Sequence, residues 1–222
     1  MDFLRTKDMY DLSHTAAAEL LADTEYPFEA LPKIKETVIK IGKTLSPDEY
    51  KKLDDNVFIA KSAKIAPTAC ICGPCIIGPD TEVRHCAYIR GSAIIGSGCV
   101  IGNSTEIKNA IIFDGVQIPH YNYVGDSILG YKSHMGAGSI ASNVRSDKKN
   151  VIIHAEDASM ETGLRKFGTM LADFAEVGCN SVLCPGSMVG KNSIIYPLSR
   201  VRGTVPSDSI YKGDVHNIIR KK

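Results

Sequence analysis

An aliphatic residue recurs at every sixth position from residue 59 onward, and a small residue follows each of the first eight after four positions. The series begins with Ile59, Ile65, Ile71, Ile77, Val83, Ile89, Ile95, Ile101 and Ile107. A period of six excludes an α-helix, whose apolar positions recur every 3.6 residues. Units with one large and one small inward position predict a triangular β-solenoid, in which each unit forms one flat wall. Three units would complete a coil, and successive coils would stack about 4.8 Å apart.

The period has two interruptions. It shortens by one residue between Ile107 and Ile112, and it breaks completely across residues 144–168. The pattern therefore predicts an all-β fold with six to seven coils over residues 56–206. We expect the polar segment 144–168 to leave one corner as a protruding loop, with a short strand at "VIIHA", and residues 207–222 to form a C-terminal tail.

Residues 1–55 lack this period and predict a small helical segment. The stretch "LPKIKETVIKIGKTL" places four apolar residues on one helical stripe, namely Ile34, Val38, Ile41 and Leu45. Ser13 is a candidate cap for an earlier helix, and "SPDE" at 46–49 has the form of a capping box. Because the ends of a solenoid expose unpaired strand edges, we expect these helices to cap the first coil. A role in oligomerisation or partner docking is the alternative.

The composition of the 222 residues is that of an ordinary globular domain, with 44% hydrophobic and 23% charged residues and a net charge of +1. Since both signs are interspersed, no basic stripe for nucleic acid and no membrane-binding face is expected. The N-terminus lacks the apolar core of a signal peptide, and no apolar run approaches the roughly 20 residues that span a bilayer. We therefore expect a cytoplasmic protein whose seven cysteines are reduced thiols.

Three of these cysteines form the sequence "CICGPC", which resembles a metal-binding cluster. The six-residue period places Cys75 in the small inward position, whereas Cys70 and Cys72 fall outside it. Ligands that point in different directions cannot close a tetrahedral site, so no metal is predicted here.

The predicted coils bring charged residues together. Arg90 and Lys108 each follow an inward residue and are 18 positions apart, so they would lie side by side on adjacent coils. Two adjacent cations repel unless an anion lies between them or their side chains splay into water. A phosphate would satisfy both cations. The alternative is a pair of splayed surface cations, with Glu106 as a partial partner.

Two further columns lie at fixed offsets from the inward residues: His85, Asn103 and His120 in one, and Tyr88, Glu106 and Tyr123 in the other. We expect both columns near the same corner as the two cations. A histidine beside a phosphate site is a candidate general base, because free imidazole titrates near neutral pH. The glycine run "MGAGS" could offer backbone N–H groups to an oxyanion, or could simply form a tight corner.

At these residues the chain resembles a known family. "IPHYNYVGDSILG" and "MGAGSIASN" are similar to the acetyltransferase domain of the bifunctional UDP-N-acetylglucosamine pyrophosphorylase and glucosamine-1-phosphate N-acetyltransferase family. The similarity extends over about residues 55–205, and "SNVRSD" is closer to the archaeal-type sugar-1-phosphate branch. The resemblance implies a left-handed β-helix, a homotrimer with active sites between subunits, and acetyl-CoA as co-substrate.

The resemblance also implies roles for individual residues. Arg90 and Lys108 match ligands of the substrate phosphate, and His120 matches the catalytic base. Tyr123 and Asn143 match contacts to the substrate. The expected acetyl-CoA contacts are Ala137, Gly138 and Cys179. Because the family's nucleotidyltransferase domain has no counterpart in the sequence, we expect N-acetylation of glucosamine-1-phosphate or galactosamine-1-phosphate without uridylyl transfer.

Two other functions stay open. A zinc enzyme of the γ-carbonic anhydrase type would use His85 and His120, but Asn122 and Gly125 occupy the region where its third histidine is expected. A non-catalytic trimer that binds a sugar phosphate is the other alternative. It is motivated by two departures from the family's pattern, His134 in place of an asparagine and Cys179 in place of a serine.

Overall fold

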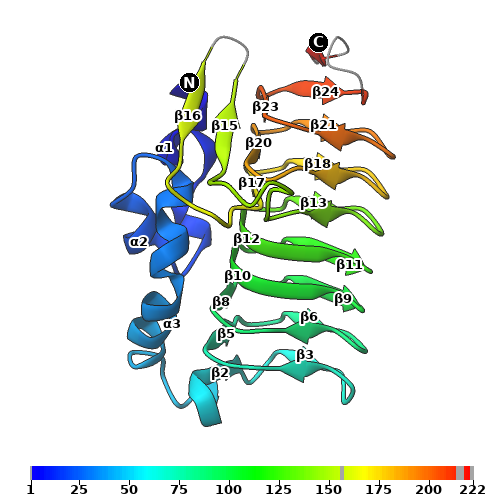
Figure 1. The fold of residues 1–222 in the computed structure, drawn as a ribbon. Coiled ribbons are helices and arrows are strands. Elements are labelled where there is room, and N and C mark those ends of the chain that lie inside the picture. Colours follow the sequence, from blue (N-terminus) through cyan, green and yellow to red (C-terminus); the bar gives the residue numbers. More distant parts are fainter. Residues whose placement is uncertain (1, 156–157, 214–217, 221–222) are drawn as a thin grey trace.

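Three walls of short parallel strands form the body of the computed structural model, which describes residues 2–155, 158–213 and 218–220. The fold is a left-handed β-helix, as the resemblance implied, and its coils stack along one axis (Figure 1). The inward residues of successive coils pair in register, for example Ile59 with Ile77 and Ile77 with Ile95. The shortened coil is also present, since Ile112 pairs with Ile95. The six-residue period thus predicts the fold correctly.

Wall 1 comprises β2 (Val57–Ala60), β5 (Cys75–Ile77), β8 (Ala93–Ile95), the second halves of β10 (Glu106–Ile112) and β12 (Tyr123–Leu129), β17 (Thr169–Leu171), β20 (Ser187–Val189) and β23 (Thr204–Val205). Wall 2 comprises β3 (Lys64–Ile65), β6 (Glu82–Val83), β9 (Val100–Asn103), β11 (Gln117–His120), β13 (His134–Met135), β18 (Glu176–Val177), β21 (Ile194–Ile195) and β24 (Ser209–Tyr211). Wall 3 comprises β4 (Cys70–Ile71), β7 (Tyr88–Ile89), the first halves of β10 and β12, β14 (Ile140–Ala141), β19 (Val182–Leu183) and β22 (Arg200–Val201).

The solenoid has about eight coils rather than six to seven, because it continues into the residues expected to form a tail. The period shortens between Val201 and Val205, and Tyr211 then fills the next inward position with 6% exposure. Beyond it, β25 (Ile218–Arg220) pairs antiparallel with β24. The search for aliphatic residues at six-residue spacing did not predict this last coil, because its spacing is shorter and its inward residue is the aromatic Tyr211.

The inward cysteines occupy the small positions that the period assigned to them. Cys75 and Cys99 are buried, whereas Cys70 and Cys72 are exposed. Burial raises the pKa of the Cys75 and Cys99 thiols to about 12. In the residues that the structure describes, no group of three His, Cys, Asp or Glu side chains is placed to hold a metal ion.

These pKa values predict a difference in thiol reactivity. At pH 8 a thiol with a pKa of about 12 is ionised in about one molecule in 10⁴, and only the thiolate reacts rapidly. Iodoacetamide should therefore label Cys75 and Cys99 at least ~100-fold more slowly than the exposed thiols of Cys86 and Cys179. Peptide mass spectrometry over a time course measures the rates. Equal labelling of all four in native protein would contradict the inward placement.

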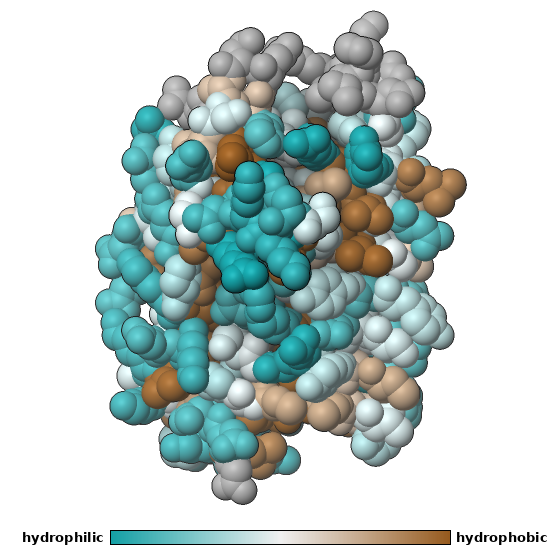
Figure 2. Space-filling view, viewed as in Figure 1, coloured by the Kyte–Doolittle hydropathy of each residue, from teal (hydrophilic) through white to brown (hydrophobic). Residues whose placement is uncertain are grey.

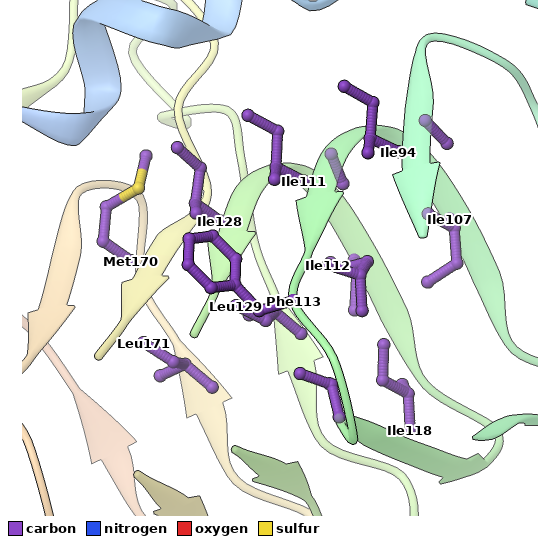
Figure 3. Close-up of a cluster of buried hydrophobic side chains, with 14 of the residues drawn as sticks. Ile94, Ile107, Ile111, Ile112, Phe113, Ile118, Ile128, Leu129, Met170 and Leu171 are labelled. Atoms are coloured by element: carbon purple, nitrogen blue, oxygen red, sulfur yellow. The ribbon is translucent and has the colours of Figure 1, made fainter. Parts of the chain in front are cut away.

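The outer face of wall 1 is apolar as well. Successive residues of a strand point to opposite faces, so the residues before the inward ones point outward. On this wall they include Phe58, Ile76, Ile94, Ile111, Ile128, Met170 and Met188, all buried, whereas Thr204 on the last strand is partly buried. Figure 3 shows Ile94, Ile111, Ile128 and Met170 pointing toward an N-terminal helix, on the side of the strands opposite Ile112, Leu129 and Leu171.

The N-terminal segment covers this outer face. It comprises η1 (Asp2–Leu4), α1 (Thr6–Met9), η2 (Leu12–His14), α2 (Ala18–Ala22), η3 (Pro27–Lys33) and α3 (Ile34–Gly42). The segment lies along the side of the solenoid (Figure 1), and α3 contacts β5, β8 and β10. Polar contacts fix it further, since the Asp11 N–H donates to Asp173 Oδ2 at 2.7 Å and the His14 ring stacks on Tyr131 at 3.6 Å.

The expectation that these helices cap the first coil was wrong, because the outer face of wall 1 is apolar and the helices pack against it. At the first coil, the edge of β2 is instead paired with β1 (Tyr50–Leu53), which runs antiparallel to it. The stripe on α3 is present for Ile34, Val38 and Ile41, of which the first two are fully buried, whereas Leu45 lies beyond the end of the helix at Gly42. The "SPDE" motif forms a turn that leads through β1 into η4 (Asp54–Asn56), and Ser13 lies in η2 rather than at the start of α2.

Residues 144–168 leave the solenoid as an irregular excursion, in agreement with the broken period. The predicted strand is present as β15 (Ile152–His154), which pairs antiparallel with β16 (Ser159–Glu161). At its neck, the Phe167 N–H donates to the Asn143 carbonyl at 3.0 Å. Among the described helices of the whole chain, none combines the length and the apolarity needed to cross a membrane.

Candidate active site

The two predicted phosphate ligands do lie in one column. Ile89 pairs with Ile107, so Arg90 and Lys108 point outward from adjacent coils of wall 3. Each cation, however, has its own carboxylate. Arg90 Nη1 donates to Glu106 Oε1 at 2.7 Å. Lys108 Nζ lies 3.2 Å from both carboxylate oxygens of Asp126.

These ion pairs correct the argument made from the sequence. Arg90 and Lys108 can lie side by side without a bound anion between them, because Glu106 compensates the charge of Arg90 and Asp126 compensates that of Lys108. The alternative in which Glu106 partners Arg90 describes the arrangement better. Arg90 keeps further N–H groups that the Glu106 contact does not use, since a guanidinium carries five.

Asp126 was not among the predicted residues. It follows Gly125 at the corner after wall 3, with a φ of 49° in the left-handed region, which aspartate tolerates better than most residues. Its carboxylate also accepts hydrogen bonds from Asn109 Nδ2 at 2.9 Å and from Asn143 Nδ2 at 2.5 Å. The column rule that paired Arg90 with Lys108 would also have paired Asn109 with Asp126, once the shortened coil was included.

Tyr123 and Asn143 join this group. Tyr123 pairs with Glu106 on the neighbouring coil, and its hydroxyl accepts a hydrogen bond from Asn143 Nδ2 at 3.1 Å. Burial raises the pKa of Tyr123, and the carboxylates of Asp126 and Glu106 raise it further. The hydroxyl therefore stays protonated near neutral pH and can donate a hydrogen bond to a ligand. We call this group the wall-3 cluster: Arg90, Glu106, Lys108, Tyr123, Asp126 and Asn143.

His120 ends wall 2 and is exposed. The register places it in one column with Asn103 below, and with Ala137 and Cys179 above. The predicted base and two of the three predicted acetyl-CoA contacts are thus brought together along the corner between walls 2 and 3. The Gly138 N–H donates to the His120 carbonyl at 2.9 Å. Because that N–H is already engaged, it is not available to bind an oxyanion.

The histidine column and the cation column lie at opposite ends of wall 3, and not at one corner as we had expected. Gly125, which shares the column of Lys108, follows His120 by five residues. Five residues span at most about 17 Å of backbone. Tyr123 lies between the two columns, so a ligand that contacts both would lie across the outer face of wall 3.

Asn122 is a second residue with a role that was not predicted, since it entered only as a residue of the region where a zinc-binding histidine is missing. It occupies an inward position that is usually small and is 3% exposed. Its Nδ2 donates to the Gly136 carbonyl at 2.7 Å, and its Oδ1 accepts from the His120 N–H at 3.1 Å. Asn122 therefore connects the strand of His120 to the glycine run. The sequence could have indicated this role, because Asn122 stands in a series of inward positions mostly filled by small residues such as Ala, Thr and Cys.

Two of the other histidines in the described part of the chain have local partners. His85 Nδ1 lies 2.9 Å from Thr68 Oγ1, and His134 Nδ1 lies 4.0 Å from Glu176 Oε2. A cavity of about 310 Å³ lies within the N-terminal segment, where Arg5, Leu21 and Glu25 contribute to its lining, and no candidate residue borders it. The candidate site is accordingly an open surface along wall 3 and its edge with wall 2.

Comparison with known proteins places this surface in a family context. Residues 71–170 match the family model described as the GMPPB C-terminal domain. A bifunctional sugar-1-phosphate nucleotidylyltransferase/acetyltransferase of Sulfurisphaera tokodaii is 32% identical over 192 residues, which cover 78% of this chain and 48% of that protein. The bifunctional protein GlmU of Methanococcus maripaludis is 32% identical over 137 residues, covering 61% of this chain and 33% of that protein. The chain is thus similar to bifunctional sugar-1-phosphate proteins over part of their length.

The chain spans between a third and about half of the length of these two relatives. Among solved structures, a hexapeptide transferase family protein of Anaplasma phagocytophilum aligns with a TM-score of 0.43 and 20% identity, over 75% of this chain and 79% of that one.

Proposed function

We propose that the protein transfers an acetyl group from acetyl-CoA to the amine of an amino-sugar 1-phosphate. The observation that carries the proposal is the 32% identity, over 78% of the chain, to a protein named for acetyl transfer in sugar-1-phosphate metabolism. The wall-3 cluster supports it, because it presents two cations, a neutral tyrosine hydroxyl and an amide on one face, and an exposed histidine lies at the other end of the same wall.

In this reaction the sugar phosphate lies across wall 3. Free N–H groups of Arg90 and Lys108 hold the phosphate, and the Tyr123 hydroxyl contacts the sugar. The amine attacks the thioester carbon, so that a C–N bond forms and the C–S bond breaks. His120 takes the proton from the attacking amine and passes it to the departing CoA thiolate. A rigid β-solenoid holds these groups in place and lowers the entropic cost of the encounter.

We further propose a homotrimer in which the edge between walls 2 and 3 meets a neighbouring subunit. Wall 1 is covered by the N-terminal segment, but this edge exposes large apolar side chains, including Tyr121 at 67% and Leu198 at 79% exposure. Ile140 and Val182 on wall 3 are also exposed. Figure 2 shows apolar residues gathered on the upper part of the solenoid edge opposite the helices. A partner subunit there would close a groove for acetyl-CoA beside His120, Ala137 and Cys179.

The deciding experiment is a CoA thiol-release assay with glucosamine-1-phosphate and galactosamine-1-phosphate. We expect saturable release with at least one of them. Retained binding of the sugar phosphate without thiol release would instead indicate a non-catalytic binding protein. Stoichiometric zinc in protein prepared without chelators would favour the carbonic anhydrase alternative.

Arg90→Ala tests the phosphate assignment. It should raise KM for the phosphorylated sugar about 10- to 100-fold, because a charge-assisted hydrogen bond is lost. Arg84→Ala is the matched control, since Arg84 also pairs with a glutamate, Glu82 at 3.2 Å, but projects from wall 2. Equal KM values in the two variants would remove Arg90 from the phosphate site.

A further inference from the structure

The most extensively bonded carboxylate of the wall-3 cluster belongs to a residue that the proposed reaction does not use. The Asp126 side chain is only 6% exposed, although it carries a charge. It accepts hydrogen bonds from Lys108, Asn109 and Asn143, which come from two other coils. A buried carboxylate is costly unless it is paired and hydrogen-bonded, and this one satisfies both conditions.

The donors around Asp126 are the groups expected to meet the substrate. Lys108 and Asn143 would contact the sugar phosphate, and Asn143 also donates to the Tyr123 hydroxyl. Asn109 in turn lies 3.4 Å from the Leu31 carbonyl of the N-terminal segment. A long lysine side chain loses much rotamer freedom when it binds a ligand. The Asp126 carboxylate already restrains Lys108 before any ligand arrives.

We propose that Asp126 is a positioning residue for the amino-sugar phosphate. It orients the Lys108 ammonium and the Asn143 amide toward the outer face of wall 3. It also neutralises the cluster, since Arg90 and Lys108 are balanced by Glu106 and Asp126. This inference rests on the proposed function. Its consequence is that the site selects a phosphate by the direction of its donors and not by an excess of positive charge.

Asp126→Asn distinguishes positioning from charge attraction. Asparagine keeps the size of the side chain and tolerates the left-handed backbone of this corner, but its amide cannot accept from all three donors. The variant should lower kcat for the sugar phosphate about 10- to 100-fold, because its donors are misdirected. Its Kd for inorganic phosphate should stay equal or fall, because Lys108 has lost its counterion. Asp147→Asn is the control, since Asp147 pairs with Arg145 in the exposed loop and should behave as wild type.

Side-chain amide signals in ¹H–¹⁵N spectra give a readout that needs no turnover. Both the Asn109 and Asn143 signals should shift in Asp126→Asn, and neither should shift in Asp147→Asn. A wild-type kcat in Asp126→Asn, or a parallel loss of kcat, phosphate binding and thermal stability, would overturn the positioning role. If the wild-type protein releases no CoA thiol, the proposed function fails. The phosphate affinity and the amide spectra then still decide whether Asp126 organises an anion site.

Discussion

Replacing His120 with alanine is expected to lower kcat about 10²- to 10⁴-fold, the range typical for loss of a general base. The amine would then reach the thioester without a group to accept its proton. Because His120 is exposed and its side chain forms no hydrogen bond with the described residues, the fold should be unaffected. Steady-state kinetics with a thiol-release readout measures kcat, and circular dichroism checks the fold.

His85→Ala is the matched control for this prediction. His85 lies in the same column two coils below His120, but its ring contacts Thr68. The variant should keep kcat within a few-fold of wild type. If both histidine variants retain full turnover, the assigned base is wrong. If both lose turnover equally, the column acts through structure and not through proton transfer.

Ile111→Ala should lower the free energy of unfolding by about 2–5 kcal/mol, the usual cost of removing a buried isoleucine side chain down to Cβ. Ile111 points outward from wall 1 and is fully buried beneath the N-terminal segment. The truncation leaves a cavity between helix and solenoid. Urea denaturation followed by circular dichroism measures the loss, and limited proteolysis should show faster cleavage within residues 2–42.

Ile140→Ala provides the comparison on another wall. Ile140 also points outward from the solenoid, but it lies on wall 3 and is 38% exposed. In the isolated subunit its truncation should cost less than about 0.5 kcal/mol, as for other surface substitutions. Equal costs for the two isoleucines would mean that the helices do not bury wall 1 in solution.

The helical cover on wall 1 had a signal in the sequence that the period argument did not use. Pairs of adjacent isoleucines occur at Ile76–Ile77, Ile94–Ile95 and Ile111–Ile112 on three successive coils, all on wall 1. One member of each pair fills the interior, so three large apolar side chains on one wall point outward and favour a cover from outside. A search for one inward position per unit treats the second residue as incidental.

The candidate site was likewise predictable from the sequence only in part. The 18-residue spacing correctly placed Arg90 beside Lys108. It was not used to place Ala137 beside His120, although it would have done so once the shortened coil was allowed for. It could not place Asp126 against Lys108, because that contact depends on how a corner residue turns its side chain back toward the wall. Nor could it measure the width of wall 3, which separates the histidine from the cations.

By itself, the sequence determined the β-solenoid, because an alternating backbone and a six-residue unit specify which side chains face inward without reference to distant segments. Tertiary structure alone decided where the N-terminal helices dock and which carboxylate neutralises each cation. Both depend on surfaces and distances that exist only after the coils have stacked, and a one-dimensional period carries no such information.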